Sequence, residues 1–290
     1  MIIDGKKEAQ LLRDEIKKEI ESIKSKNNEV PGLTVILIGD FAPSQIYVKN
    51  KQKNAKEVGI NSEVVRYPKD VSEKEVLKKI IELNENDAVS GILVQLPLPS
   101  QVNKEKIINA INPLKDVDGF HPINYGKMAL GIDTFLPATP AGIIELIERS
   151  KIQTEGKKCL VIGRSQIVGR PISILLSQNK IFGNSTVTVA HSRTSNLEEL
   201  CLDSDLIISA IGKPEFIKGN MIKKGSTVID VGITRVDDSS SHKGYRIAGD
   251  VDFNSVSSRV GFITPVPGGV GPMTIAMLLK NTLKACSLSD

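Results

Sequence analysis

The chain has 290 residues, of which 40% are hydrophobic and 25% are charged, and its formal net charge is +4. Its three cysteines are an odd number without CxxC spacing, which argues against a disulfide framework or a zinc site. Basic and acidic residues alternate instead of clustering with aromatic residues, so no nucleic-acid partner is expected. No apolar run approaches the roughly 18 residues of a membrane span, and no basic, apolar leader opens the chain, so we expect a cytoplasmic protein without a membrane partner.

The first half of the chain alternates helical and strand patterns. Amphipathic spacing predicts a long helix over residues 6–26, and the apolar run LTVILIG predicts a strand over residues 33–39. The next predicted helix, residues 44–58, ends at Gly59 as a C′ residue. This half is completed by a strand over residues 63–67, a helix opened by the capping pair Ser72 and Glu75, and a buried strand over residues 91–97.

The second half begins at Thr139, which is predicted to be an N-cap because a proline occupies the first helical position after it. Four apolar runs then predict strands over residues 159–163, 186–191, 206–212 and 227–232. We expect the polar stretch 236–246 to be an exposed, mobile loop. A last helix is predicted over residues 272–285.

Strands separated by helical segments are typical of the α/β class with mostly parallel sheets. We therefore expect two domains with a cleft between them. One is an N-terminal α/β domain of residues 1–140, with the C-terminal helix, residues 272–290, packed back on it. The other is a Rossmann-like nucleotide-binding domain of residues 141–271.

The segment GRSQIVG, residues 163–169, lies between a predicted strand and a predicted helix. This placement is typical of a phosphate-binding turn, in which glycines permit a tight turn and free backbone N–H groups at the helix start face an anion. Ser165 stands where the GxGxxG pattern has its middle glycine. A purely structural strand-to-helix turn is the alternative interpretation.

The end of the next predicted strand bears on the choice of cofactor. NAD enzymes usually place a carboxylate there for the ribose 2′-hydroxyl, whereas this strand ends in His191, Ser192, Arg193 and Thr194. Hydroxyls with a guanidinium suit a 2′-phosphate, so NADP is favoured over NAD, and Arg164 could add a second cation. The alternative is an ordinary polar loop that caps the following helix.

Tyr47 and Lys51 are four residues apart in a predicted helix and therefore share one face of it. The helix follows the end of a strand, where α/β domains usually bind ligands. A lysine there can carry protons if partial desolvation lowers its pKa. A solvated lysine on a Lys-rich helix is the alternative.

Three polar groups in two further segments are candidates for orienting a ligand. Gln95 ends a buried strand and is followed by prolines that restrict it, so its amide can orient a lysine or a ligand. The turn KDVDGFHP, residues 115–122, holds Asp116, Asp118 and a histidine. A carboxylate there can accept hydrogen bonds from an aminopyrimidine-like group, and a metal site is the less favoured alternative.

The segment TPVPGGVGPMT, residues 264–274, combines prolines and glycines immediately before the last helix. Prolines fix some backbone torsions and glycines free others, which builds a shaped loop that can lie against a flat ligand. A rigid connector between domains is the alternative.

Together these segments resemble a known family. They are Tyr47-x-x-x-Lys51, VQLPLP (residues 94–99), KDVDGFHP, GRSxIVGxP (residues 163–171) and PVPGGVGPMT (residues 265–274). Their order and spacing are similar to those of the bifunctional methylenetetrahydrofolate dehydrogenase/methenyltetrahydrofolate cyclohydrolase family. The resemblance implies an enzyme that oxidises methylenetetrahydrofolate to methenyltetrahydrofolate with NADP and hydrolyses the product to 10-formyltetrahydrofolate.

The resemblance also implies roles for single residues. Lys51 looks like the general acid/base of the hydrolytic step, Gln95 like its orienting partner, and Asp118 like the group that holds the pterin ring. Tyr47 would stack on the folate. The folate pocket would be lined by Pro265, Pro267, Gly268 and Gly269, and the cofactor would be contacted by Gly163, Arg164, Ser165, Ser192 and Ile233.

By the same resemblance, the partners are a small-molecule folate substrate and a second copy of the chain, in a homodimer formed through the cofactor domains, and no metal is expected. Two other functions stay open from the residues. One is a monofunctional NAD-dependent dehydrogenase of the same fold. The other is a non-catalytic nucleotide-binding regulatory module, which would bind a ligand without turnover.

Overall fold

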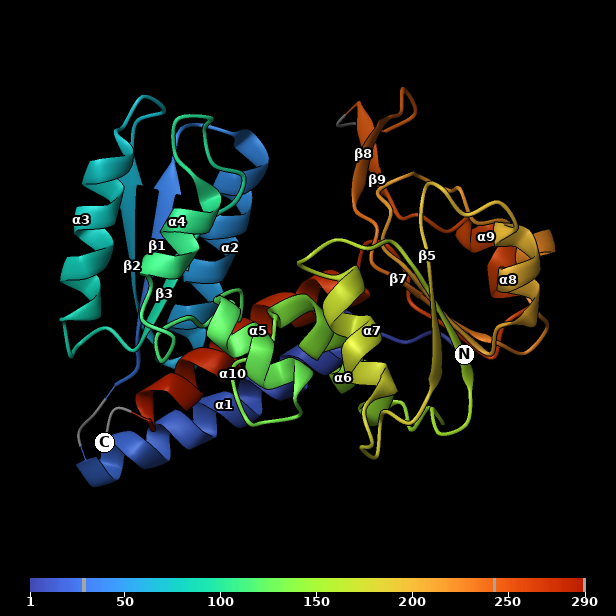
Figure 1. Cartoon of the computed structure of the whole chain (residues 1–290), viewed down its shortest axis with the longest axis horizontal. Helices are drawn as coiled ribbons and strands as arrows, with labels where there is room; N and C mark the ends of the chain where they lie inside the picture. Colours follow the sequence, from blue (N-terminus) through green and yellow to red (C-terminus); the bar gives the residue numbers. More distant parts are fainter. Residues whose placement is uncertain (28–29, 242–243, 289–290) are drawn as a thin grey trace. The chain divides into compact units, whose positions relative to one another are not determined.

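A computed structural model describes residues 1–27, 30–241 and 244–288 (Figure 1). The chain divides into two compact units. The three-stranded unit consists of Gln10–Ala138 and Ile275–Asp290, and the five-stranded unit consists of Met1–Ala9 and Thr139–Thr274. Both main sheets are parallel, so the prediction of an α/β fold is confirmed.

The first nine residues lie with the five-stranded unit, whereas the sequence placed the first 140 residues in one domain. Ile2 forms an isolated parallel bridge with Ile263, and the Ile3 amide donates to the Ile263 carbonyl at 2.8 Å. The Lys6 amide donates to the Gly268 carbonyl at 2.9 Å. These backbone bonds join residues more than 250 positions apart, and local sequence patterns do not carry that information.

The three-stranded unit has strand order β2-β1-β3. Every residue of β1 is buried, as expected for a central parallel strand covered on both faces. Ile36 and Ile38 of β1 pack with Val76 and Ile80 of α3 in one core, and α2 lies on the opposite side of the sheet (Figure 1). The elements are α1 (Gly5–Asn27), β1 (Gly32–Ile38), α2 (Ala42–Val58), β2 (Asn61–Tyr67), α3 (Glu73–Asn84), β3 (Gly91–Val94), α4 (Lys104–Ala110) and α5 (Pro122–Ala129).

Local signals place the ends of several of these helices. Gly59 caps α2 in the left-handed conformation with φ of 92°, and the Ser72 hydroxyl accepts the Glu75 amide at 3.2 Å. The predicted strand to residue 97 is too long, since β3 ends at Val94 and Pro97 has no amide to extend the ladder. The short helices α4 and α5 were not predicted.

The five-stranded unit has strand order β10-β7-β6-β4-β5, and the four strands predicted from apolar runs are confirmed. Its core contains Leu160 and Ile207 of the central strands and Ile263 of β10. The elements are α6 (Ala138–Arg149), β4 (Lys158–Ile162), α7 (Gly169–Ser177), β5 (Thr186–Ala190), α8 (Leu197–Asp203), β6 (Leu206–Ser209), η1 (Gly219–Met221), β7 (Thr227–Asp230), β8 (Thr234–Asp237), β9 (Tyr245–Ala248), α9 (Phe253–Ser257) and β10 (Phe262–Ile263). The last helix, α10 (Val270–Cys286), begins in this unit, and from Ile275 onward it belongs to the three-stranded unit.

Two local predictions in this unit are wrong. The stretch 236–246 is not a loop throughout, because β8 and β9 pair as an antiparallel hairpin, and the Arg235 guanidinium lies 3.9 Å from the centre of the Tyr245 ring. Residues 242–243 of that stretch lie outside the described residues. Thr139 is not an N-cap, since α6 already begins at Ala138.

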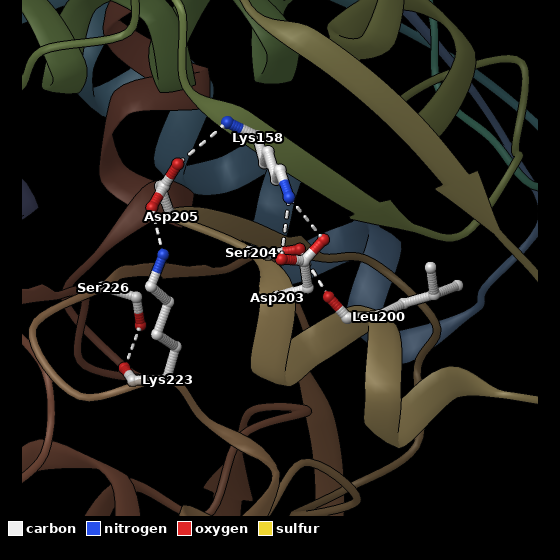
Figure 2. A network of polar contacts seen from close by, with 7 residues as sticks. All are labelled: Lys158, Leu200, Asp203, Ser204, Asp205, Lys223 and Ser226. Carbon is white, nitrogen blue, oxygen red and sulfur yellow. Dashed lines mark hydrogen bonds and ion pairs between the residues drawn. The ribbon is translucent and has the colours of Figure 1, made fainter.

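A network of charged residues ties the amino ends of the strands together (Figure 2). Lys158, at the start of β4, donates from Nζ to both carboxylate oxygens of Asp203 at 2.8 Å. Asp205 accepts the Lys158 amide at 3.0 Å and Lys223 Nζ at 2.6 Å, and these bonds hold the pKa of its carboxyl below the ordinary value. Because these side chains are partly or largely exposed, solvent screens both ion pairs. Their contribution is to align the strand starts.

Candidate active site

Lys51 lies on the buried stripe of α2. The stripe has helical spacing and comprises Ser44, Val48, Lys51, Ala55 and Val58. The lysine is only 8% exposed, and this burial lowers the pKa of its amine because desolvation disfavours the charged form. An amine in this setting exchanges protons nearer neutral pH than a solvated lysine does.

Gln95 directly follows β3 and contacts Lys51. Nζ of Lys51 donates to Oε1 of Gln95 at 3.0 Å, and Nε2 of Gln95 donates to the Leu96 carbonyl at 2.8 Å. The Gln95 amide donates to the Ile36 carbonyl at 2.9 Å, which fixes its backbone to β1. The side-chain carbonyl of Gln95 is therefore held toward the lysine.

Asp118 completes a cluster with these two residues. Burial raises the pKa of its carboxyl to about 6, and the negative charge of Asp116 raises it further, although the positive charge of Lys51 lowers it. In return, the charge of Asp118 raises the pKa of Lys51 against the larger effect of burial. Near pH 7 the carboxylate is ionised, while the amine loses its proton more readily than it would in water.

Tyr47 lies one helical turn before Lys51 on α2. Its side chain is 38% exposed, and partial burial raises the pKa of its hydroxyl. The exposed part of the Tyr47 side chain can therefore contact a ligand, while the rest of it stays buried.

The structure also reveals residues that sequence reasoning did not assign. Asp116 accepts the Phe120 and His121 amides at 3.2 and 2.8 Å, so this carboxylate shapes the turn that presents Asp118. Asn281 of α10 holds the same turn by donating to the Val117 carbonyl at 2.8 Å. An aspartate whose side chain accepts backbone amides four and five residues later shapes a turn, and the turn residues Asp116, Asp118 and Gly119 are the sequence signal that could have identified it.

His121 lies at the start of α5. Its Nδ1 accepts the Ile123 amide at 3.1 Å, which makes it the N-cap of α5, with Pro122 at the first helical position. In the parts of the chain that the structure describes, no three His, Cys, Asp or Glu residues are grouped to hold a metal ion.

In the five-stranded unit, the turn after β4 requires its glycines. Gly163 has φ of +120°, and a β-carbon there would collide with the Ala210 carbonyl oxygen. The Ser165 hydroxyl accepts the Val168 and Gly169 amides at 3.2 and 3.3 Å. The Val168 and Gly169 amides at the start of α7 are therefore bonded to Ser165, and the anion-binding role of this turn stays a prediction.

The other cofactor candidates lie at the same edge of the sheet. Gly163, Ser192 and Ile233 follow β4, β5 and β7, and the carboxyl ends of parallel strands share one edge. The Thr194 hydroxyl accepts the His191 amide at 3.0 Å, and this tight turn exposes Ser192 and Arg193. Arg164 is exposed as well. A hydroxyl and two guanidiniums, without a carboxylate in the turn, fit a phosphorylated nucleotide.

The loop that contains Pro265, Pro267, Gly268 and Gly269 belongs to this unit and leads into α10, whose second residue, Gly271, lies near Ile233. A β-carbon on Gly271 would be 3.4 Å from Cδ1 of Ile233. One on Gly269 would be 2.6 Å from the Pro265 carbonyl oxygen, so the loop is closely folded on itself. The candidate folate-lining loop and a candidate cofactor residue are thus neighbours.

Comparison with known proteins places both units in one family. Residues 3–118 match the model of the tetrahydrofolate dehydrogenase/cyclohydrolase catalytic domain, and residues 137–290 match that of the tetrahydrofolate dehydrogenase/cyclohydrolase NAD(P)-binding domain. The chain belongs to the tetrahydrofolate dehydrogenase/cyclohydrolase family. This membership confirms the resemblance predicted from the sequence and the prediction of an enzyme.

Individual relatives cover nearly the whole chain. The bifunctional protein FolD of Flavobacterium johnsoniae is 56% identical over 98% of this chain and 96% of its own length. The crystal structure of the bifunctional FolD dehydrogenase/cyclohydrolase of Campylobacter jejuni has 45% identity and a TM-score of 0.93 over 99% of both chains. The Trypanosoma brucei enzyme, solved with NADP and an inhibitor, has 38% identity and a TM-score of 0.95, covering 100% of this chain and 98% of its own.

Among the described residues, no helix has the length and apolar character needed to cross a membrane.

Proposed function

We propose that the protein oxidises methylenetetrahydrofolate to methenyltetrahydrofolate with NADP and then hydrolyses this product to 10-formyltetrahydrofolate. The observation that carries the proposal is the partly buried contact of 3.0 Å between Lys51 Nζ and Gln95 Oε1, beside Asp118. Family membership supports it, as do the bifunctional relatives. The three-stranded unit carries the hydrolytic residues, and the five-stranded unit binds the cofactor.

The hydrolytic step follows from a lysine of lowered pKa. Neutral Lys51 accepts a proton from the water whose oxygen bonds to the electrophilic methenyl carbon. As the bond from that carbon to N5 of the folate breaks, Lys51 returns a proton to N5. The hydroxyl formed on the carbon releases its remaining proton to solvent as it becomes the formyl carbonyl, and the formyl group remains on N10. Gln95 keeps the amine pointed at the reacting carbon, and a positioned proton carrier of this kind contributes typically 10²–10⁴-fold to the rate.

Asp118 and Tyr47 hold the substrate in this proposal. The carboxylate of Asp118, ionised above about pH 6, accepts hydrogen bonds from the amino and ring N–H groups of the pterin. The exposed ring of Tyr47 stacks on the folate. Pro265, Pro267, Gly268 and Gly269 of the five-stranded unit also contact the folate in this proposal.

The residues at the carboxyl edge of the five-stranded sheet hold the cofactor. Bound NADP supplies the acceptor for the hydride that leaves the methylene carbon. Gly163 and Ser165 form the turn beside the phosphates, and Arg164 and Ser192 supply charge and a hydroxyl for them. Ile233 packs against the cofactor. In this step the chain holds the folate and the cofactor in a fixed mutual orientation.

The test follows absorbance of the purified protein with methylenetetrahydrofolate and either NADP or NAD. Reduced NADP and methenyltetrahydrofolate are followed separately. We expect reduced NADP to form without lasting accumulation of methenyltetrahydrofolate. Persistent methenyltetrahydrofolate with NAD would favour the monofunctional dehydrogenase, and binding without reduction of either cofactor would favour a regulatory module.

We further propose that the protein is a cytoplasmic homodimer formed through the cofactor domains. Strand β5 is an edge of the five-stranded sheet, and Val189 on it is 38% exposed. An exposed edge strand can pair with a second copy. Sedimentation at the monomer mass of 31.5 kDa would contradict the dimer.

A further inference from the structure

Two carboxylates with no role in the scheme above are buried at the carboxyl edge of the five-stranded sheet. Asp250 is 0% exposed and Asp230 is 3% exposed. Burial, together with the charge of Asp250, raises the pKa of Asp230 to about 6, although three backbone amides lower it. Buried acids cost folding free energy, so their contacts need an explanation.

Asp250 binds the segment that follows β6. Its Oδ2 accepts the Ile211 amide at 2.7 Å and the Ser209 hydroxyl at 3.2 Å. Its Oδ1 accepts the Lys213 amide at 2.9 Å. One side chain thereby fixes the course of the chain over residues 209–213.

Asp230, the last residue of β7, binds two other segments. Its Oδ1 accepts the Gly232 and Asp250 amides, both at 2.9 Å, and its Oδ2 accepts the Val251 amide at 2.9 Å. Its own amide donates to the Thr264 hydroxyl at 2.8 Å. Asp230 therefore joins the ends of β7 and β10 to the segment that carries Asp250.

The held segments carry the candidate cofactor residues. The Ala210 carbonyl, immediately before Ile211, is the group against which Gly163 packs. Gly232 precedes Ile233, and a β-carbon on Gly232 would be 2.5 Å from the Asp250 carboxyl carbon. The position of Asp250 thus affects two parts of the candidate cofactor site. These are the Ala210 carbonyl, against which Gly163 packs, and the segment that carries Ile233.

We propose that Asp250, supported by Asp230, is a positioning residue that sets the affinity for NADP by holding residues 209–213 against residues 230–233. The inference rests on the proposed function, since it concerns the same cofactor site. Asp250 does not touch the reacting atoms. It acts through Ala210 on Gly163 and through Gly232 on Ile233.

The test replaces the carboxylate by an amide of the same shape, Asp250→Asn. Whichever way the new amide turns, its NH₂ group faces the Ile211 or the Lys213 amide, and one backbone donor loses its acceptor. We expect the Kd for NADP to rise at least about 10-fold. The buried donor without an acceptor destabilises the arrangement of residues 209–213 and 230–233, and the cost of such a donor corresponds to roughly that change in Kd. The matched control is Asp252→Asn, which removes a carboxylate that caps α9 and pairs with Lys218.

The Kd is measured by titration calorimetry without folate, since the chain has no tryptophan to report binding. Melting temperature and cofactor-free hydrolysis of methenyltetrahydrofolate are measured beside it. A positioning role predicts a weaker Kd in Asp250→Asn at a temperature where it is fully folded, with hydrolysis within about 2-fold of the parent and the control unchanged. A folded Asp250→Asn with the parental Kd would overturn the inference.

If Asp250→Asn does not fold, Ser209→Ala tests the positioning role of Asp250 instead. It removes only the hydroxyl that donates to Asp250, and its control, Ser204→Ala, removes a buried hydroxyl at the opposite edge of the sheet that donates to the Leu200 carbonyl. We expect a Kd about 3-fold weaker for Ser209→Ala alone. Equal Kd values for both variants would overturn the inference. A parent protein that binds no NADP would instead overturn the proposed function, and this inference with it.

Discussion

Nζ of Lys51 lies 3.0 Å from Oε1 of Gln95, although the two residues are 44 positions apart in the chain. The contact arises because α2 follows β1 and Gln95 follows β3, and β1 and β3 are hydrogen-bonded neighbours. A buried amine held by a neutral carbonyl can gain or lose a proton without breaking an ion pair. This property distinguishes the site from a structural salt bridge.

The first prediction concerns the charge at position 95. Gln95→Glu places a carboxylate next to Lys51, which raises the pKa of the amine because an opposite charge favours its protonated form. The pH at which hydrolysis of methenyltetrahydrofolate becomes fast should therefore move upward relative to the parent. Gln95→Leu removes the acceptor without adding charge. It should lower the rate by about 10-fold or more without that upward displacement, and equal pH profiles for parent and Gln95→Glu would rule out this role for Gln95.

The second prediction concerns Asp118 and the pH dependence of stability. The folded-state pKa of about 6 lies above the ordinary value of 3.8, so the folded protein keeps a proton that the unfolded chain has already released. The contribution of Asp118 to the free energy of unfolding therefore falls as pH rises from about 4 to about 6, and is constant above that range. Asp118→Asn lacks this titration.

The melting temperature of the parent minus that of Asp118→Asn should thus decrease between pH 4 and pH 6. Asp230, whose pKa is also raised to about 6, is present in both proteins and contributes equally to each. A difference in melting temperature that stays constant over this range would contradict the raised pKa of Asp118.

The third prediction concerns the phosphate turn. Gly163→Ala forces a side chain into φ of +120° and toward the Ala210 carbonyl, so we expect a loss of about 1–3 kcal/mol in the free energy of unfolding. The Kd for NADP should rise at least about 10-fold in the folded variant. Gly156→Ala is the control, since Gly156 also has positive φ but its β-carbon would meet nothing within 4 Å. Similar NADP affinities in the two variants would mean that the turn does not bind the cofactor.

The fourth prediction concerns cofactor choice. Removing the two exposed guanidiniums, in Arg164→Gln with Arg193→Gln, should reduce kcat/KM for NADP by about 10-fold or more and leave that for NAD nearly unchanged, because only NADP carries the 2′-phosphate. Arg259→Gln, whose guanidinium donates to the Ile222 carbonyl, is the control. Equal losses with NADP and NAD would show that these arginines do not read the 2′-phosphate.

Sequence reasoning could predict those features that depend on local chemistry. Apolar runs identified the buried strands of both sheets, and Gly59 and Ser72 marked helix ends through their own backbone and hydroxyl preferences. The spacing of Tyr47 and Lys51 placed both on one helix. The proximity of Lys51 to Gln95 needed the strand order as well, and only the resemblance to the family suggested it.

The remaining features depend on contacts between distant segments. Asp230 and Asp250 look like surface acids in the sequence, and their burial follows from amides supplied by Ile211, Lys213 and Val251. The helices α4 and α5 are too short for periodicity to identify them. The β8–β9 hairpin has polar residues on one face, so composition alone suggested a loop.

The central claim, that one chain carries both activities and that Lys51 serves the second, is tested most directly by Lys51→Met supplied with methylenetetrahydrofolate and NADP. We expect reduced NADP still to form while methenyltetrahydrofolate accumulates with it, because hydrolysis falls by about 100-fold or more. Lys53→Met is the control. The Lys53 side chain is 73% exposed, and its ion pair is with Glu57, one helical turn later on α2. Hydrolysis of methenyltetrahydrofolate by Lys51→Met at the parental rate would contradict the account.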